Sequence, residues 1–249
     1  MQEIEFKFQV PVKKRKALQK AFTLLKAEPI HLAAQYFDTA DQTLAKHCIA
    51  IRRRQENDEW KQTFKAVNSA KVLSRLELEF DIAPPETTTL DLDNYKDYSA
   101  IYKKLKRALG LPLPTLELLF ETNIQRLRVL QDVGNSTVEI ALDIGKIFEE
   151  QNSVDIFEIE FELKQGSIED LIAFIRPWVQ KYQLSLDTHS KSDYGLLAVR
   201  QQSYFSAQYQ TPLVLNRSSS EVEALQSIVA NCLQHLLPNA SSIARQQYS

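Results

Sequence analysis

Apolar and polar residues alternate along much of this chain. The alternation is clearest at residues 3–7, which read EIEFK, and at residues 158–162, which read EIEFE. Because successive side chains of a β-strand point to opposite faces, each stretch would place its charges on one face and its apolar residues on the other. Similar patterns predict eight strands, near residues 2–10, 30–38, 48–56, 59–67, 73–82, 116–130, 136–149 and 153–164.

Three other stretches carry apolar residues at helical spacing. They predict helices over Lys13–Lys26, Tyr98–Leu109 and Ser167–Tyr182. Gly110 is expected to end the second of these helices. Pro177 lies inside the third, where it should kink or divide the helix because proline lacks the backbone N–H.

The polar faces of the predicted strands are mostly charged. A single strand of this kind is typical of an antiparallel sheet with one solvated face. Seven such strands, with apolar helices available to cover the other side, favour a barrel whose charges point inward. We therefore predict an α+β fold built on a closed antiparallel eight-stranded β-barrel, with a charged lumen and surrounding helices. The charged faces include Arg52 and Arg54, Lys61 and Lys65, Arg75 to Asp81, Arg126 and Arg128, and Glu139 and Asp143.

A lumen lined by both carboxylates and cations suits a polyphosphate bound together with a divalent metal ion. Arginine holds phosphate oxygens through paired hydrogen bonds, and lysine acts as a compact point charge. Carboxylates would bind Mg²⁺ or Mn²⁺, and the metal ion would bridge to the phosphate oxygens. The alternation alone does not decide which carboxylates coordinate.

Composition narrows the remaining classes of function. The chain has 249 residues and a net charge of −2, which does not suggest broad nucleic-acid binding. Two cysteines give no disulfide framework, five glycines leave no phosphate-cradling loop, and no nucleophile-elbow sequence is present. A strand pattern starts at the N-terminus and no apolar run is long enough for a membrane span. We therefore expect a soluble cytoplasmic protein with no nucleic-acid or membrane partner.

The ordered motifs resemble the CYTH family of triphosphate tunnel metalloenzymes. Besides EIEFK at 3–7 and EIEFE at 158–162, they are YFDT at 36–39, Thr63-x-Lys65, the Glu139-x-Ala141-x-Asp143 strand, and Ser190-Lys191. The resemblance covers roughly residues 1–200 and is greatest to bacterial inorganic triphosphatases, which are often joined to a helical CHAD domain. It implies hydrolysis of inorganic triphosphate to pyrophosphate and phosphate with Mg²⁺ or Mn²⁺. The substrate class is inorganic triphosphate or another polyphosphate, and whether long polyphosphate is cut stays open.

The resemblance also implies roles for individual residues. The first metal ion would be bound by Glu3, Glu5 and one or more of Glu158, Glu160 and Glu162, with Glu160 and Glu162 favoured. Asp143, with Glu77 or Glu139, is expected to serve a second metal ion and the attacking water. The phosphate clamps would be Lys7, Arg52, Arg54, Lys65, Arg75, Arg126 and Lys191, with Arg128 and Lys61 as weaker candidates.

The role of the C-terminal region stays open in the sequence. Residues 1–200 are predicted to form the tunnel domain, and residues 201–249 a linker and helix that resemble the start of a CHAD domain. The alternative is a C-terminal helix packed on the outside of the barrel.

A class IV adenylate cyclase and a thiamine triphosphatase are alternative activities, although no base- or thiamine-recognition motif is visible. A polyphosphate-binding module without turnover is an alternative of another class.

Overall fold

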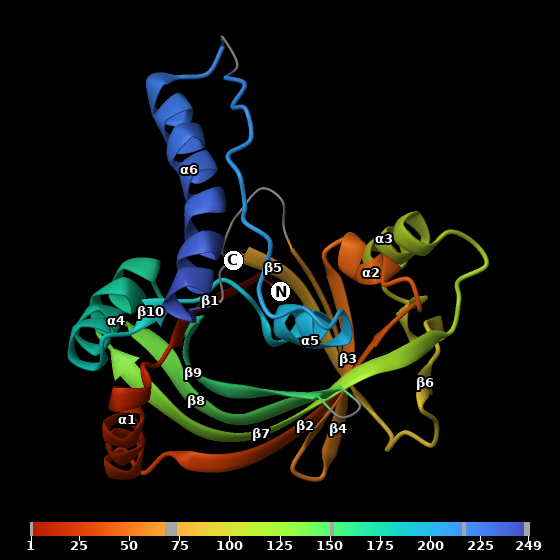
Figure 1. Ribbon diagram of the computed structural model, residues 1–249, viewed down its shortest axis with the longest axis horizontal. Coiled ribbons are helices and arrows are strands. Elements are labelled where there is room, and N and C mark those ends of the chain that lie inside the picture. The colour runs from red at the N-terminus through yellow and green to blue at the C-terminus, as the bar shows by residue number, and fades with distance from the viewer. Residues whose placement is uncertain (1, 68–73, 150–151, 216–217, 247–249) are drawn as a thin grey trace.

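A computed structural model describes residues 2–67, 74–149, 152–215 and 218–246, and the fold is α+β. One antiparallel sheet of ten strands dominates it (Figure 1). The eight predicted strands are all present, and β6 and β10 are two-residue additions that the sequence pattern did not indicate. The bounds are β1 (Gln2–Gln9), β2 (Glu28–Asp38), β3 (Ile49–Glu56), β4 (Glu59–Val67), β5 (Ser74–Ile82), β6 (Thr89–Leu90), β7 (Leu116–Val133), β8 (Ser136–Glu149), β9 (Asn152–Gln165) and β10 (Ser185–Leu186).

The strand order is β10-β1-β5-β4-β3-β2-β7-β8-β9, with β6 beside β7. Strand β1 pairs with three strands: Gln2–Ile4 with β5, Glu5–Gln9 with β9, and Phe8 and Gln9 also with β10. In the part of the chain that is described, β1 and β5 therefore meet at three residue pairs. The predicted closed barrel of eight strands is not confirmed: the sheet has ten strands, and it forms a strongly curved trough (Figure 1).

Helices cover the convex, apolar side of the sheet in two places. Helices α1 (Val12–Leu24) and α4 (Ile168–Tyr182) pack on β1, β8 and β9, where Phe22, Phe161 and Leu171 form a buried core. Helices α2 (Thr43–Lys46) and α3 (Ser99–Leu109), with a short 3₁₀ turn at Asp93–Tyr95, cover β3 and β4. These contacts bury the apolar faces of the strands, so their charged faces point to the concave side.

Pro177 was expected to kink or divide this segment, and the structure shows no division: helix α4 continues through it. Leu171 and Ile175 precede the proline and Tyr182 follows it, and all three are buried against the sheet. This packing holds the helix together although one backbone hydrogen bond is lost.

Helix α5 (Lys191–Val199) lies on the concave side of the sheet against β7, β8 and β9 (Figure 1). Ser190 caps its first turn, and Asp193 completes a capping box with it. Gly195 allows the close approach, because a Cβ atom there would lie 2.2 Å from the ring of Phe120. The helix thereby places Lys191, its first residue, inside the trough.

Helix α6 (Glu221–Ala244) stands away from the sheet, and its C-terminal end lies near β1 and β10 (Figure 1). Apolar side chains along its projecting part are exposed, among them Leu225 and Leu236. The domain boundary near residue 200 and the likeness of this region to a CHAD domain stay predictions. Across the described residues, every helix lacks either the length or the apolar composition needed to cross a bilayer.

Candidate functional site

The concave side of the sheet holds a cavity of about 600 Å³ lined mostly by charged side chains. Strand alternation explains this lining, because the charged residues occupy every second position on the strands that contribute to it. Most of the predicted site residues lie here. They are Glu5, Lys7, Arg52, Arg54, Lys65, Glu77, Arg126, Arg128, Glu139, Glu160, Glu162 and Lys191.

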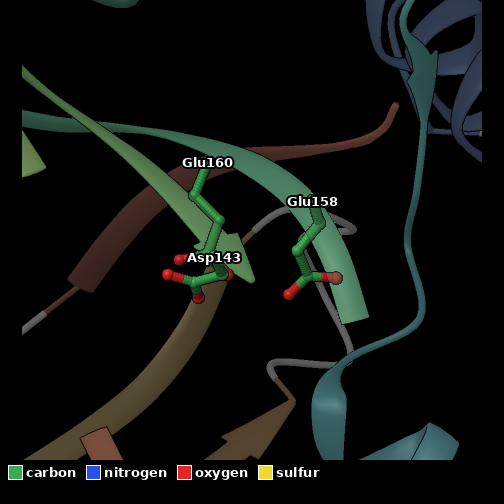
Figure 2. Close-up of side chains that lie close together, drawn as sticks. All are labelled: Asp143, Glu158 and Glu160. Atoms are coloured by element: carbon green, nitrogen blue, oxygen red, sulfur yellow. The ribbon is translucent and has the colours of Figure 1, made fainter. Parts of the chain in front are cut away.

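Three carboxylates gather at the buried edge of this cavity. Asp143 on β8 and Glu158 on β9 are direct cross-strand partners, and Glu160 follows on the same face of β9. One oxygen from each carboxylate lies within 4.8 Å of the others, and Figure 2 shows the three side chains converging. Buried carboxylate oxygens at this spacing fit a hard divalent cation such as Mg²⁺ or Mn²⁺.

Lysine and arginine side chains balance these carboxylates. The Lys191 ammonium lies 2.7 Å from Asp143, 2.5 Å from Glu158 and 2.7 Å from Glu160. Arg126 donates two hydrogen bonds of 2.7 Å to Asp143 and another to Glu160. Lys7 completes the set at 3.0 Å from Glu158. Buried Lys7 and the largely buried Arg126 and Lys191 therefore neutralise the three buried carboxylates, which makes their burial energetically tolerable.

The pKa values of this cluster reflect the pairing. Burial raises the pKa of Asp143 and of Glu160, but the positive charges of Arg126 and Lys191 outweigh it. The pKa of Asp143 consequently lies below its usual value, and that of Glu160 well below. Burial lowers the pKa of Lys191, yet the three carboxylates raise it well above the ordinary lysine value. All of these groups are charged at neutral pH.

We expect the cluster to make stability sensitive to acid. The ordinary pKa values are 3.8 for Asp143 and 4.5 for Glu160, and both are lower in the folded state. The ion pairs therefore stabilise the fold fully above the ordinary values, and that contribution is lost as pH falls below about 4. Urea unfolding between about pH 7 and about pH 3 should show a falling free energy of unfolding. A Glu160→Gln variant with the same pH dependence as the unmodified chain would contradict this assignment.

A second, more basic part of the cavity is formed by β3, β4 and β5. Lys65 lies 3.0 Å from Glu77, and the Arg54 guanidinium lies 3.2 Å from both Glu56 and Glu79. These cations are therefore held in place by carboxylates that also line the cavity. Lys65 and Arg54 thus lie along one wall of the cavity, with cationic groups that can donate hydrogen bonds to phosphate oxygens.

The role of Asp143 with Glu77 or Glu139 at a second metal ion stays a prediction. In the structure the Asp143 carboxylate lies beside those of Glu158 and Glu160. Glu77 contacts Lys65, and Glu139 lies 3.6 Å from Lys164. The side chains of Glu3 and Arg75 lie outside the described part of the chain, although their backbones pair between β1 and β5.

Several described residues near the cavity were not predicted as site residues, among them Tyr36, Lys164 and Asp187. Tyr36 accepts a 3.3 Å hydrogen bond from Arg52, its cross-strand partner. Lys164 continues the every-second-residue series of β9, so the alternation could have indicated it. Asp187 contacts Lys7 at 3.5 Å from just beyond β10, and no sequence pattern marks it.

Known proteins resemble this chain in sequence and in fold. The sequence profile of the CYTH domain matches residues 1–193. An inorganic triphosphatase of Haemophilus influenzae is 32% identical over 201 residues, which are 79% of this chain and 55% of that protein. The chain thus spans about half the length of this curated relative.

Solved structures support the fold. A putative adenylate cyclase from Bacillus halodurans has a TM-score of 0.54 at 20% identity, covering 77% of this chain and 96% of that one. A putative adenylyl cyclase from Hippeastrum, described as having a dominant triphosphatase activity, has a TM-score of 0.52 at 18% identity. It covers 80% of this chain and 96% of its own. At these identities the likeness concerns the arrangement of the elements.

Proposed function

Because this chain belongs to the CYTH domain family, we propose that its cavity binds inorganic triphosphate with a divalent metal ion and hydrolyses it to pyrophosphate and phosphate. The observation that carries the proposal is the buried cluster of Asp143, Glu158 and Glu160, matched by cations and continuous with a wall of arginines and lysines. The sequence likeness to an inorganic triphosphatase supports the choice of substrate. The preference for Mg²⁺ or Mn²⁺ is part of the proposal and rests on the oxygen-only ligand set.

Binding can proceed by an exchange of ion pairs. In the free protein, Lys191 and Arg126 neutralise the carboxylates of the cluster. Glu160, Asp143 and Glu158 would hold a divalent metal ion, and Lys191 and Arg126 would then be available to pair with phosphate oxygens. Every buried charge would keep a partner in this exchange. This matters because an unpaired buried charge is strongly destabilising.

Hydrolysis of a phosphoanhydride requires positioning and charge neutralisation more than covalent chemistry. A bound divalent ion supplies Lewis-acid polarisation of the phosphate oxygens. We assign to Arg52, Arg54 and Arg126 the neutralisation of charge on the phosphate chain. Glu139 lines the cavity and is a candidate for orienting the water that attacks the terminal phosphorus; Glu77 is the alternative. The bond from that phosphorus to the bridging oxygen breaks, and pyrophosphate leaves.

We further propose that the eight long strands enclose the substrate as a tunnel. The pairing of β1 with both β5 and β9 supports this arrangement, since it links the two sides of the trough. A tunnel would exclude bulk water from the phosphates and thereby strengthen each ionic contact.

The lining of the cavity favours triphosphate over a substrate with a large organic group. Among the described lining residues, the aliphatic side chains are Leu32, Ala50 and Leu163, while most of the others are charged. A nucleobase or thiamine ring would need apolar or aromatic surface to pack against. Tyr36 offers one ring, but that ring is stacked on Phe120 with centroids 4.5 Å apart.

The direct test is to measure phosphate and pyrophosphate release from inorganic triphosphate, with and without Mg²⁺ or Mn²⁺. ATP and thiamine triphosphate should be assayed in parallel. Metal-dependent release with triphosphate preferred would support the proposal. Formation of cyclic AMP from ATP would instead indicate a cyclase, preference for thiamine triphosphate would indicate that phosphatase, and tight binding without turnover would indicate a binding module.

Arg54 and Arg53 provide a matched pair for testing the clamp. The Arg54 side chain lines the cavity, whereas Arg53 lies over the ring of Phe37 and donates a 3.1 Å hydrogen bond to the carbonyl of Thr87. Arg54→Ala should raise KM for triphosphate and lower kcat, together about 10-fold to 100-fold in kcat/KM, because a clamp contacts ground and transition states. Arg53→Ala should leave both constants nearly unchanged. A larger effect at Arg53 than at Arg54 would contradict the assignment of the faces of β3.

A further inference from the structure

Lys7 is held from two sides. On one side its ammonium contacts Glu158 of the carboxylate cluster at 3.0 Å. On the other side it lies 3.5 Å from Asp187 and donates a hydrogen bond to the backbone carbonyl of His189. The backbone N–H of Asp187 also donates a 2.8 Å hydrogen bond to the carbonyl of Lys7. The segment after β10 therefore fixes both the backbone and the ammonium group of this lysine.

Asp187 is itself fixed by a second layer of contacts. Its carboxylate is buried and accepts a 2.9 Å hydrogen bond from the hydroxyl of Tyr194 and a 3.0 Å bond from the backbone of His189. Burial raises the pKa of Asp187, but the charge of Lys7 and the bonds from His189 lower it to a net value below the usual range. The carboxylate is thus ionised and has little freedom to turn.

The C-terminal end of helix α6 packs directly behind this layer. The Arg245 guanidinium lies over the Tyr194 ring, 3.9 Å from its centroid, at a distance typical of a cation–π contact. Ser241 is fully buried, and its hydroxyl accepts a 3.1 Å hydrogen bond from the backbone N–H of Thr188. Its carbonyl accepts a 2.9 Å bond from Gln9 of β1. One end of α6 is therefore tied both to the residue after Asp187 and to the strand that carries Lys7.

We infer that Asp187, Tyr194 and Arg245 are positioning residues for Lys7, and that the end of helix α6 is a supporting part of the site. This inference rests on the proposed function and on the role of Lys7 as a phosphate clamp, which the family resemblance implies and which its place in the cavity lining supports. Arg245 lies beyond residues 1–193, so the support comes from outside the part of the chain that matches the family. A lysine side chain has four rotatable bonds, and without Asp187 its ammonium could move wholly to the carboxylates of the cluster.

The experiment compares Asp187→Asn and Arg245→Ala with matched variants on other surfaces. Asp155→Asn serves for the first, because Asp155 is exposed on β9 and pairs with Lys146 at 3.3 Å. Arg107→Ala serves for the second, since Arg107 is exposed on α3. Each variant is assayed with inorganic triphosphate and Mn²⁺. Its lysines are also labelled with an amine-reactive reagent and quantified by mass spectrometry, with Lys191 as the internal reference.

For Asp187→Asn and Arg245→Ala we expect kcat to fall by about 10-fold, as is typical when a supporting residue is removed. Labelling of Lys7 should rise severalfold while labelling of Lys191 stays constant, because Lys191 is held by Asp143, Glu158 and Glu160 instead. Arg245→Lys should recover most of both properties, since lysine retains a cation over the Tyr194 ring. A general loosening of the fold would expose Lys191 as well, and would overturn the inference.

Unchanged labelling of Lys7 in both variants would also overturn it, whatever the activity. If the unmodified chain does not hydrolyse triphosphate, the proposed function fails, and the labelling ratio still decides whether Asp187 and Arg245 hold Lys7. The two failures are therefore distinguishable.

Discussion

Replacing Glu160 with glutamine is expected to lower metal-dependent turnover of inorganic triphosphate by about 100-fold, the loss typical of removing one preorganised electrostatic group. Glu160 contacts Lys191 at 2.7 Å and also pairs with Arg126, and it belongs to the cluster that fits a divalent ion. Glutamine keeps the shape of the side chain but loses the charge. The affinity for the metal ion should fall, and Lys191 and Arg126 should be held less firmly in position.

Glu117→Gln is the matched control for this variant. Glu117 is an exposed carboxylate on β7, away from the cluster, and its replacement should leave kcat/KM almost unchanged. The comparison should be made over a range of Mn²⁺ concentrations, because a weakened metal site is expected to need more metal. Turnover of Glu160→Gln within about twofold of the unmodified chain would exclude Glu160 from the metal site.

Replacing Lys191 with methionine is expected to lower the free energy of unfolding by about 3 kcal/mol in metal-free buffer, the lower end of what breaking a buried ion pair costs. Methionine keeps an unbranched apolar chain but removes the charge. Asp143, Glu158 and Glu160 would then share fewer buried cations, and Asp143 has no exposed surface with which to recover solvation. Urea denaturation measures the change.

Lys96→Met provides the comparison for an exposed pair. Lys96 lies 2.6 Å from Asp93, but both side chains are more than half exposed. Its loss should leave the free energy of unfolding almost unchanged, as is usual for surface ion pairs. Equal effects of the two substitutions would show that the Lys191 cluster is solvated and that its buried geometry is wrong.

Strand positions and strand faces could be predicted because the two-residue period is a local property of the chain. Residues 158–162 alternate in sequence, and in the structure Ile159 and Phe161 enter the core while Glu160 lines the cavity. The short strands β6 and β10 could not be predicted. Each has two residues, too few to show a period, and exists because a neighbouring strand pairs with it. The pairing of β1 with β5, β9 and β10 is a tertiary feature of the same kind.

Most residues that line the cavity could be predicted, but which carboxylates lie side by side could not. The contact between Asp143 and Glu158 depends on the register of β8 against β9, which alternation does not reveal. Asp187 was missed because its role comes from its place behind Lys7, and a lone aspartate after a two-residue strand gives no signal. Helix α5 is similar, since only the Ser190-Lys191 motif indicated that this segment reaches the site.

The central claim is that the carboxylate cluster and the arginine wall hold one metal ion and one triphosphate together. X-ray diffraction from crystals grown with Mn²⁺ and a non-hydrolysable triphosphate analogue tests it most directly, with data collected at the manganese absorption edge. We predict an anomalous peak that places manganese within coordinating distance of Glu160 and of the analogue. The phosphates of the analogue should contact Arg126 and Lys191. Manganese and analogue found only outside the cavity would contradict the account.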